Sequence, residues 1–300
     1  MKKHLIFNST LLVLFILVFH STQIAAEPEH SLSAKESWKK WTLDREKRMG
    51  SPKGWMSLAG LYWLNEGNNT IGSDKNNQQR FPKKAPAFVG NVVVKGDTVT
   101  IEVNDPKVLV NGKKTISALL SVKDRTRVTF GSFTFFIIKR EKGYAIRLRD
   151  SQNPALKTFQ GLDFYPYNPE WVKSARLIEN LKPKKLMIQT VYGTFRHEKS
   201  AGWIEFTHNG ETYRLQAVDS GPEEPLFIMF TDGTSEKETY GAGRYIYIPR
   251  ADNNGNTVID FNYVYNPPCA FTHFATCPLP PRSNKLKVKI KAGEKYSGHH

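Results

Sequence analysis

Cysteine is scarce in this sequence of 300 residues, which contains only Cys269 and Cys277. Two cysteines cannot brace a disulfide-rich scaffold, so the chain must fold around a hydrophobic core. The sequence also lacks a Gly-x-Ser-x-Gly motif, a phosphate-cradling Gly-rich loop and a His-Glu-x-x-His motif. These absences disfavour a serine hydrolase and a nucleotide enzyme.

Acidic residues are few relative to basic ones, with 28 Asp and Glu against 43 Lys and Arg, which gives a formal charge of +15. A strongly basic protein attracts anionic partners such as polysaccharides, phosphates or membrane surfaces. The lysines are spread along the chain and no basic and aromatic motif accompanies them, so we expect no nucleic-acid partner. We expect no cofactor either.

Long apolar runs are absent after the first 26 residues, so we expect no transmembrane segment in the mature chain. The chain opens with Met1-Lys2-Lys3-His4, continues with an apolar run over residues 11–19, and reaches small residues at Ala25 and Ala26. This order is typical of a secretory signal peptide. We therefore predict a signal peptide over residues 1–26 and an exported protein, periplasmic or secreted.

Export decides how the two cysteines are interpreted. In an oxidising compartment we expect Cys269 and Cys277 to form a disulfide, and closing this short loop stabilises the fold by about 2.6 kcal/mol in the chain-entropy model. The alternative is a metal site formed by Cys269, His273 and Cys277, whose side chains are ligand types that suit zinc or copper.

After the predicted signal peptide, the sequence predicts a mainly β fold. Residues 27–68 are predicted to form an N-terminal helix and linker, with an amphipathic helix over residues 31–49 that starts at a Ser33–Glu36 capping box and packs on the following sandwich. Residues 69–150 alternate as short strands between turn residues, which is typical of a β-sandwich. Residues 151–300 predict a second antiparallel β domain, either a barrel or a sandwich, with a strong hairpin signal at His208-Asn-Gly-Glu.

Near the C-terminus, residues 260–281 hold both cysteines, five prolines and five aromatic residues. Proline fixes φ and removes a hydrogen-bond donor, so this segment is predicted to be an ordered irregular loop. Ordered loops of this length are usually functional. Trp55 and Trp63 lie in a Gly-punctuated stretch that we interpret as a strand or turn packed on the core, with a pocket wall as the alternative.

Five motifs occur along the chain in a fixed order. They are Gly54-Trp55-x-Ser57-Leu58-Ala59-Gly60-Leu61-Tyr62-Trp63-Leu64, Ile71-Gly72-Ser73-Asp74, Arg147-Leu148-Arg149-Asp150, Thr239-Tyr240-Gly241-Ala242-Gly243-Arg244-Tyr245 and Asn266-Pro267-Pro268-Cys269-Ala270-Phe271-Thr272. By these motifs the chain resembles, over roughly residues 35–296, the DUF1684 family, a domain of unknown function.

Residues 69–140 also resemble, more weakly, a forkhead-associated (FHA) sandwich. FHA domains bind phosphothreonine through an arginine after an early glycine and a later Ser-x-x-His. Here Ser73 follows Gly72 and no Ser-x-x-His is present, so the resemblance implies the architecture alone.

Polar residues that a core would not select gather at a few places. Arg147 and Arg149 alternate in a predicted strand, so both point to one face, where two guanidiniums suit a bound carboxylate or phosphate or form a salt-bridged surface. Asp260 and Asn262 share one face of a strand, either lining a pocket or facing solvent. In a dry pocket, Asp260 is a candidate general base. The ligand-binding candidates are Arg147, Arg149, Tyr240, Arg244, Asn262, Tyr265 and Asn266.

Three functions fit this pattern. The first is a protein that binds a small anionic or carbohydrate-like ligand in a polar pocket of the C-terminal β domain. The second is a hydrolase-type enzyme with Asp260 as its base. The third is a structural module of the cell envelope that has no small-molecule site and leaves the arginines exposed.

Overall fold

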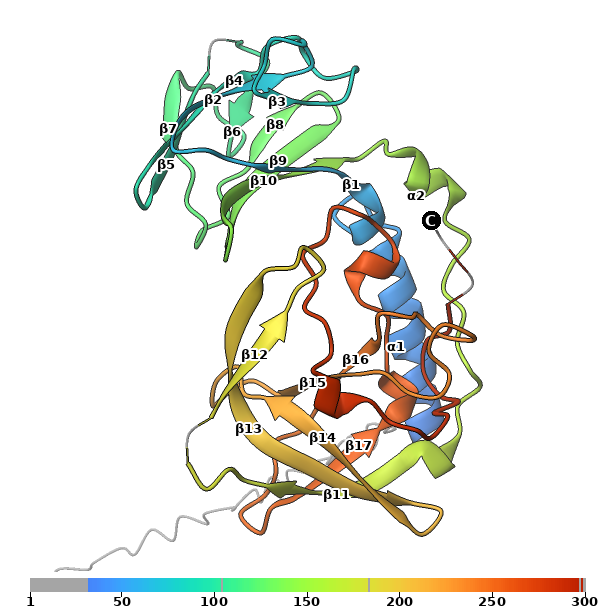
Figure 1. The fold of residues 1–300 in the computed structure, drawn as a ribbon. Coiled ribbons are helices and arrows are strands. Elements are labelled where there is room, and N and C mark those ends of the chain that lie inside the picture. The colour runs from blue at the N-terminus through green and yellow to red at the C-terminus, as the bar shows by residue number, and fades with distance from the viewer. Residues whose placement is uncertain (1–31, 104, 183, 297, 299–300) are drawn as a thin grey trace, which may run out of the picture.

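The computed structural model describes residues 32–103, 105–182, 184–296 and 298. The predicted signal peptide, residues 1–26, lies outside the described residues. The described chain is mainly β, as predicted, and folds into a smaller sandwich and a larger curved sheet with a long helix beside it (Figure 1). No helix in these ranges is long and apolar enough to cross a membrane.

Helix α1 spans Ala34–Met49 and begins at the predicted capping box, where the Ser33 amide donates to Glu36 Oε2 at 2.8 Å. The prediction that this helix packs on the sandwich is wrong. Its aromatic side chains instead contact the second domain, where the Trp38 indole donates to the Asn262 carbonyl at 3.0 Å and the Trp41 ring lies 5.0 Å from that of Tyr263. Half-buried aromatic partners on the second domain therefore determine where the helix lies.

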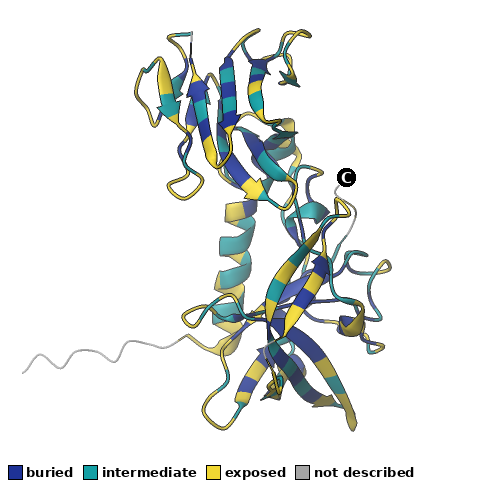
Figure 2. Ribbon diagram, turned by 60° about the vertical axis from the view of Figure 1, so that its left-hand side comes forward, coloured by how far each residue is buried: buried dark blue, intermediate teal, exposed yellow. Residues whose placement is uncertain are grey.

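Two five-stranded sheets form the sandwich. Alternating apolar residues point inward from both sheets and form one core, visible as the alternating burial in Figure 2. Strand β1 pairs with β10, so the sandwich begins at Leu58, ahead of the predicted boundary at residue 69. One sheet has the order β1 (Leu58–Trp63), β10 (Gly143–Asp150), β9 (Phe133–Arg140), β8 (Val128–Phe130) and β6 (Leu109–Val110). The other has the order β3 (Gln79–Arg80), β2 (Gly67–Gly72), β4 (Gly90–Lys95), β5 (Thr98–Glu102) and β7 (Ser117–Leu119).

The second domain is one antiparallel half-barrel sheet of seven strands. The predicted hairpin is confirmed: His208 pairs with Glu211, and Asn209 and Gly210 both have positive φ, as a tight hairpin turn requires. In sheet order the strands are β16 (Arg244–Ile248), β15 (Leu226–Phe230), β14 (Glu211–Val218), β13 (Phe195–His208), β11 (Val172–Ile178) and β17 (Asn256–Asp260), and β12 (Lys185–Gln189) pairs with β13.

Irregular segments connect these sheets. The predicted irregular loop, residues 260–281, is confirmed: after Asp260, the last residue of β17, it contains only the short 3-10 turns η3 (Phe261–Tyr263) and η4 (Pro268–Ala270). A further turn, η5 (Arg282–Asn284), follows it. This loop runs between the two domains, because Leu279 N donates to Gln189 O at 2.7 Å on β12 and Thr276 accepts from Arg140 on β9. The remaining short helices are η1 (Trp55–Ser57), α2 (Pro154–Thr158) and η2 (Pro169–Trp171).

Candidate functional site

A cavity of about 430 Å³ lies where the sandwich, the curved sheet and the irregular loop of residues 260–281 meet. Its floor is one face of the curved sheet, because Phe227 on β15 pairs directly with Tyr247 on β16 and Met229 pairs with Tyr245. Cross-strand neighbours share a face, so these side chains form a continuous surface of apolar and aromatic groups. Tyr265, from the loop, extends this surface.

Another part of the cavity lining carries positive charge. Arg147 reaches it from β10, Arg140 from β9 and Arg196 from β13. The Arg140 Nε and Arg147 Nη2 groups both donate to the hydroxyl of Thr276, at 3.2 and 3.4 Å. Two guanidiniums therefore converge on a single neutral oxygen.

Arg147 is the most unusual of these residues, since its side chain is only 5% exposed. Its guanidinium lies 5.4 Å from the centre of the Trp55 ring, and its Nε has no hydrogen-bond partner among the described residues. No carboxylate in the described ranges forms an ion pair with it. Burial first, and then repulsion from Arg140 and Arg149, lower the pKa of Arg147 to about 10.

Arg196 contrasts with Arg147. It forms an ion pair with Glu198 on the same strand, and its Nε lies 3.9 Å from Glu141. Its charge is therefore compensated within the protein. Neither Arg140 nor Arg147 forms an ion pair among the described residues, and Arg147 is the more deeply buried of the two.

Cys277 lies in the wall of the cavity, and the structure contains no bond between its sulfur and that of Cys269. The Cys269 amide donates to Cys277 Sγ at 3.2 Å. A hydrogen bond between the two side chains lowers the pKa of Cys269 and, together with burial, raises that of Cys277. The alternative metal site is not formed: His273 is exposed, and no cluster of three or more metal-binding side chains occurs in the described ranges.

Arg149 points to the same face as Arg147, as predicted, but it does not line the cavity. Its Nη1 donates to the carbonyl oxygens of Lys53 and Gly54 and to Ser57 Oγ, the last at 3.1 Å. These partners occupy its guanidinium. Arg149 therefore fixes the turn that follows α1, which holds Trp55 beside Arg147.

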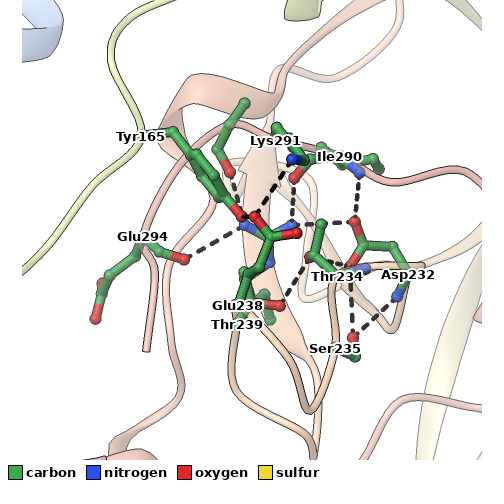
Figure 3. A network of polar contacts seen from close by, with 11 residues as sticks. Tyr165, Asp232, Thr234, Ser235, Glu238, Thr239, Ile290, Lys291 and Glu294 are labelled. Atoms are coloured by element: carbon green, nitrogen blue, oxygen red, sulfur yellow. Dashed lines mark hydrogen bonds and ion pairs between the residues drawn. The ribbon is translucent and has the colours of Figure 1, made fainter. Parts of the chain in front are cut away.

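Arg244 is also separate from the cavity. It is 1% exposed and its guanidinium donates to Asp232 Oδ2 at 3.3 Å, with further hydrogen bonds to the carbonyls of Ile290, Ala292 and Glu294. Figure 3 shows this network around Asp232, Ile290 and Glu294. Burial lowers the pKa of Arg244. The residue ties the C-terminal segment to the curved sheet, so its role is structural.

Asp260 and Asn262 do not line the cavity either. Asp260 caps η3 by accepting from the Asn262 amide at 3.0 Å, and burial raises its pKa. The Asn262 side chain both accepts from and donates to the Asn168 backbone, each at 2.9 Å. These two residues thus clamp the connection that precedes β11.

The remaining candidates divide in the same way. Tyr265 lines the cavity, with Arg45 on its ring at 4.7 Å. Asn266 is buried and donates to the Lys295 carbonyl at 2.8 Å. The Tyr240 hydroxyl donates to the Cys269 carbonyl at 3.2 Å, and burial raises its pKa. The predicted single pocket of seven residues is therefore wrong: only Arg147 and Tyr265 line one cavity, and Cys277 joins them.

Sequence reasoning missed Arg140, Arg196, Thr276, Tyr245 and Tyr247. Tyr245 and Tyr247 alternate in a strand, which identified the strand but not its partner domain. Thr276 lies between Cys269 and Cys277 in the loop that was predicted to be functional. That position was the one feature of the sequence that could have identified it as a site residue. Trp55, interpreted as a core residue, lines the cavity.

The comparisons with known proteins address family and fold. A family model described as "Protein of unknown function (DUF1684)" matches residues 157–295, which confirms the resemblance for that part of the chain. No curated protein matches the sequence.

Among solved structures, the chain is similar to an uncharacterized protein of Haloarcula marismortui, with 26% identity and a TM-score of 0.41 over 48% of this chain and 80% of that one. It is also similar to an FHA domain studied for phosphothreonine-dependent interactions, with 20% identity and a TM-score of 0.22 over 29% of this chain and 81% of that one. At these TM-scores neither defines a ligand for this chain.

Proposed function

Starting from a chain whose residues 157–295 match a family of unknown function, we propose that this protein binds a small anionic ligand in the cavity between the sandwich and the curved sheet. The observation that carries this proposal is the Arg147 guanidinium, which is buried, lacks an acidic partner among the described residues and reaches the cavity.

Burial of an uncompensated charge costs several kcal/mol, so a protein keeps such a group only where something offsets the cost. Trp55 and Thr276 offset part of it. An oxyanion in the cavity supplies the missing charge. Guanidinium groups match carboxylates and phosphates in shape, which gives the anion a defined orientation.

The other two functions have less support. A hydrolase with Asp260 as base needs that carboxylate at the ligand, yet Asp260 caps η3 outside the cavity. A structural module without a ligand site leaves the arginines exposed, whereas Arg147 is buried beside a cavity. Binding is therefore the function that the geometry favours.

Isothermal titration calorimetry with inorganic phosphate tests the proposal. Wild-type protein is expected to bind phosphate, and Arg147→Met to lose at least about tenfold in affinity, since charge-assisted hydrogen bonds to one anion contribute roughly 1.5–3 kcal/mol each. Arg214→Met is the matched control, because Arg214 is exposed and pairs with Glu205 on the curved sheet. Equal affinity in all three proteins would contradict the proposal.

Export and the disulfide belong to the same proposal. The charge pattern of the first 26 residues supports a cleaved signal peptide, and the contact between Cys269 and Cys277 supports their pairing after export. The intact mass of the protein recovered from a secreting host is the test. A mass lacking residues 1–26 and two thiol hydrogens is expected, whereas a full-length mass with two reactive thiols would contradict both points.

A further inference from the structure

We infer that the ligand is an acidic pyranose, that is, a monosaccharide ring that carries a carboxylate or a phosphate. This inference rests on the proposed function and adds the body of the ligand to its charge. It comes from the way the cavity combines a cationic side, an aromatic floor and further polar groups in its lining.

The cationic side fixes the acidic group. Arg140 and Arg147 donate to Thr276 Oγ1 at 3.2 and 3.4 Å, which is long compared with the roughly 2.7–2.9 Å of charge-assisted hydrogen bonds. A neutral hydroxyl thus occupies a position at which two guanidiniums converge. An oxyanion of the ligand takes over these donors and forms shorter, stronger hydrogen bonds.

The floor accepts the ring. Tyr247 is 53% exposed, unlike its neighbour Tyr245, and its ring is stacked on Tyr265 at 6.3 Å and lies 4.9 Å from that of Phe227. An exposed aromatic ring held by two aromatic neighbours is a rigid platform. One face of a pyranose consists of C–H groups, which pack on such a platform while the hydroxyls point away from it.

The lining of the cavity also supplies partners for those hydroxyls. Glu198 on β13 and Ser220 after β14 both line it. Glu198 is held by Arg196, so its carboxylate is an oriented acceptor. A flat aromatic acid has no hydroxyls to use these groups, and burying them against such a ligand costs free energy. The combination therefore favours a hydroxylated ring.

Calorimetric titrations with glucose 6-phosphate, glucuronate, glucose, benzoate and inorganic phosphate test this inference. The two acidic sugars are expected to bind, with glucose 6-phosphate about tenfold or more tighter than inorganic phosphate, because the ring adds its own contacts. Glucose is expected to bind weakly because it lacks the anion. Tyr247→Ala is expected to reduce the affinity for glucose 6-phosphate about tenfold and that for inorganic phosphate much less. Phe88→Ala, an exposed aromatic on the sandwich, is the control.

The outcomes separate the two proposals. If glucose 6-phosphate binds no tighter than inorganic phosphate, or if benzoate binds tighter than glucuronate, the acidic pyranose is overturned while anion binding at Arg147 stands. Glucose binding as tightly as glucose 6-phosphate also overturns it. If no anion binds, both proposals fail together. An unchanged affinity in Tyr247→Ala contradicts the placement of the sugar on the floor.

Discussion

Two buried arginines with opposite surroundings define this protein at the scale of single residues. Arg244 donates to a carboxylate and to three backbone carbonyls, so its charge is compensated within the fold. Arg147 has Trp55 and a threonine hydroxyl as neighbours and no acidic partner in the described chain. The sequence marks both as candidates, and only the structure separates a structural arginine from one that is available to a ligand.

We predict that Arg244→Met destabilises the protein by about 3–5 kcal/mol, because it leaves the buried Asp232 carboxylate without its cation and three carbonyls without their donors. Urea unfolding monitored by tryptophan fluorescence measures the change. Arg214→Met is the control, with an expected effect within about 0.5 kcal/mol, since Arg214 is exposed and paired at the surface. A loss in Arg244→Met no larger than the control's would refute the structural role.

Asp219 gives the pH dependence at this scale. Hydrogen bonds from Lys199 and then from Arg250 lower the pKa of Asp219 to about 2. A carboxyl whose pKa is lower in the folded state stabilises the fold above its unfolded pKa, near 3.9, and this contribution is lost as the pH falls through about 2. Asp219→Asn is therefore expected to lower the free energy of unfolding by about 1 kcal/mol at pH 7, a value reduced to allow for screening by solvent. At pH 2 the substitution is expected to have almost no effect. A pH-independent difference in unfolding free energy would contradict this explanation.

At the scale of elements, the C-terminal segment of residues 290–294 connects the curved sheet to the irregular loop after β17. Arg244 donates to backbone carbonyls of this segment, and Gly293, whose φ is +74°, lies directly against Val264 of the loop. A Cβ on Gly293 meets the Val264 carbonyl oxygen at 2.5 Å. Glycine is required here both for its backbone conformation and for the close approach.

Gly293→Ala is therefore predicted to destabilise the protein more than Gly210→Ala does. Both glycines have positive φ, which costs alanine about 1–2 kcal/mol, but a Cβ on Gly210 has nothing within 4 Å. The clash at Gly293 adds at least about 1 kcal/mol to that shared cost. Thermal unfolding of the two variants measures the difference, and equal midpoints would show that the packing of this segment is loose.

Local elements were the part of the fold that the sequence predicts well. The capping box at Ser33, the hairpin turn at Asn209 and the irregular loop around Cys269 follow from chemistry within a few residues, and all three are confirmed. The partner of helix α1 was predicted wrongly. Its aromatic stripe shows that it packs on something, whereas the partner surface is formed by residues more than a hundred positions away.

At the scale of the whole molecule, the candidate site belongs to neither domain alone. The sandwich supplies Arg140 and Arg147, the curved sheet supplies Tyr247, and the loop supplies Thr276. Its composition depends on how the two domains meet, which no local pattern encodes. This explains why, of the residues predicted to line a pocket in the C-terminal domain, only Arg147 and Tyr265 line the cavity. Arg244 and Asn262 instead form structural hydrogen bonds within that domain.

The most direct test of the account is thermal unfolding of wild-type protein and Arg147→Met, each with and without inorganic phosphate. Without phosphate, Arg147→Met is predicted to unfold at the same or a higher temperature, because methionine removes a buried uncompensated charge at similar volume. With phosphate at about 100 times its Kd, only the wild type gains stability, by about 2.7 kcal/mol. A lower midpoint for Arg147→Met without phosphate, together with equal phosphate shifts in both proteins, would contradict the account and make Arg147 a structural residue.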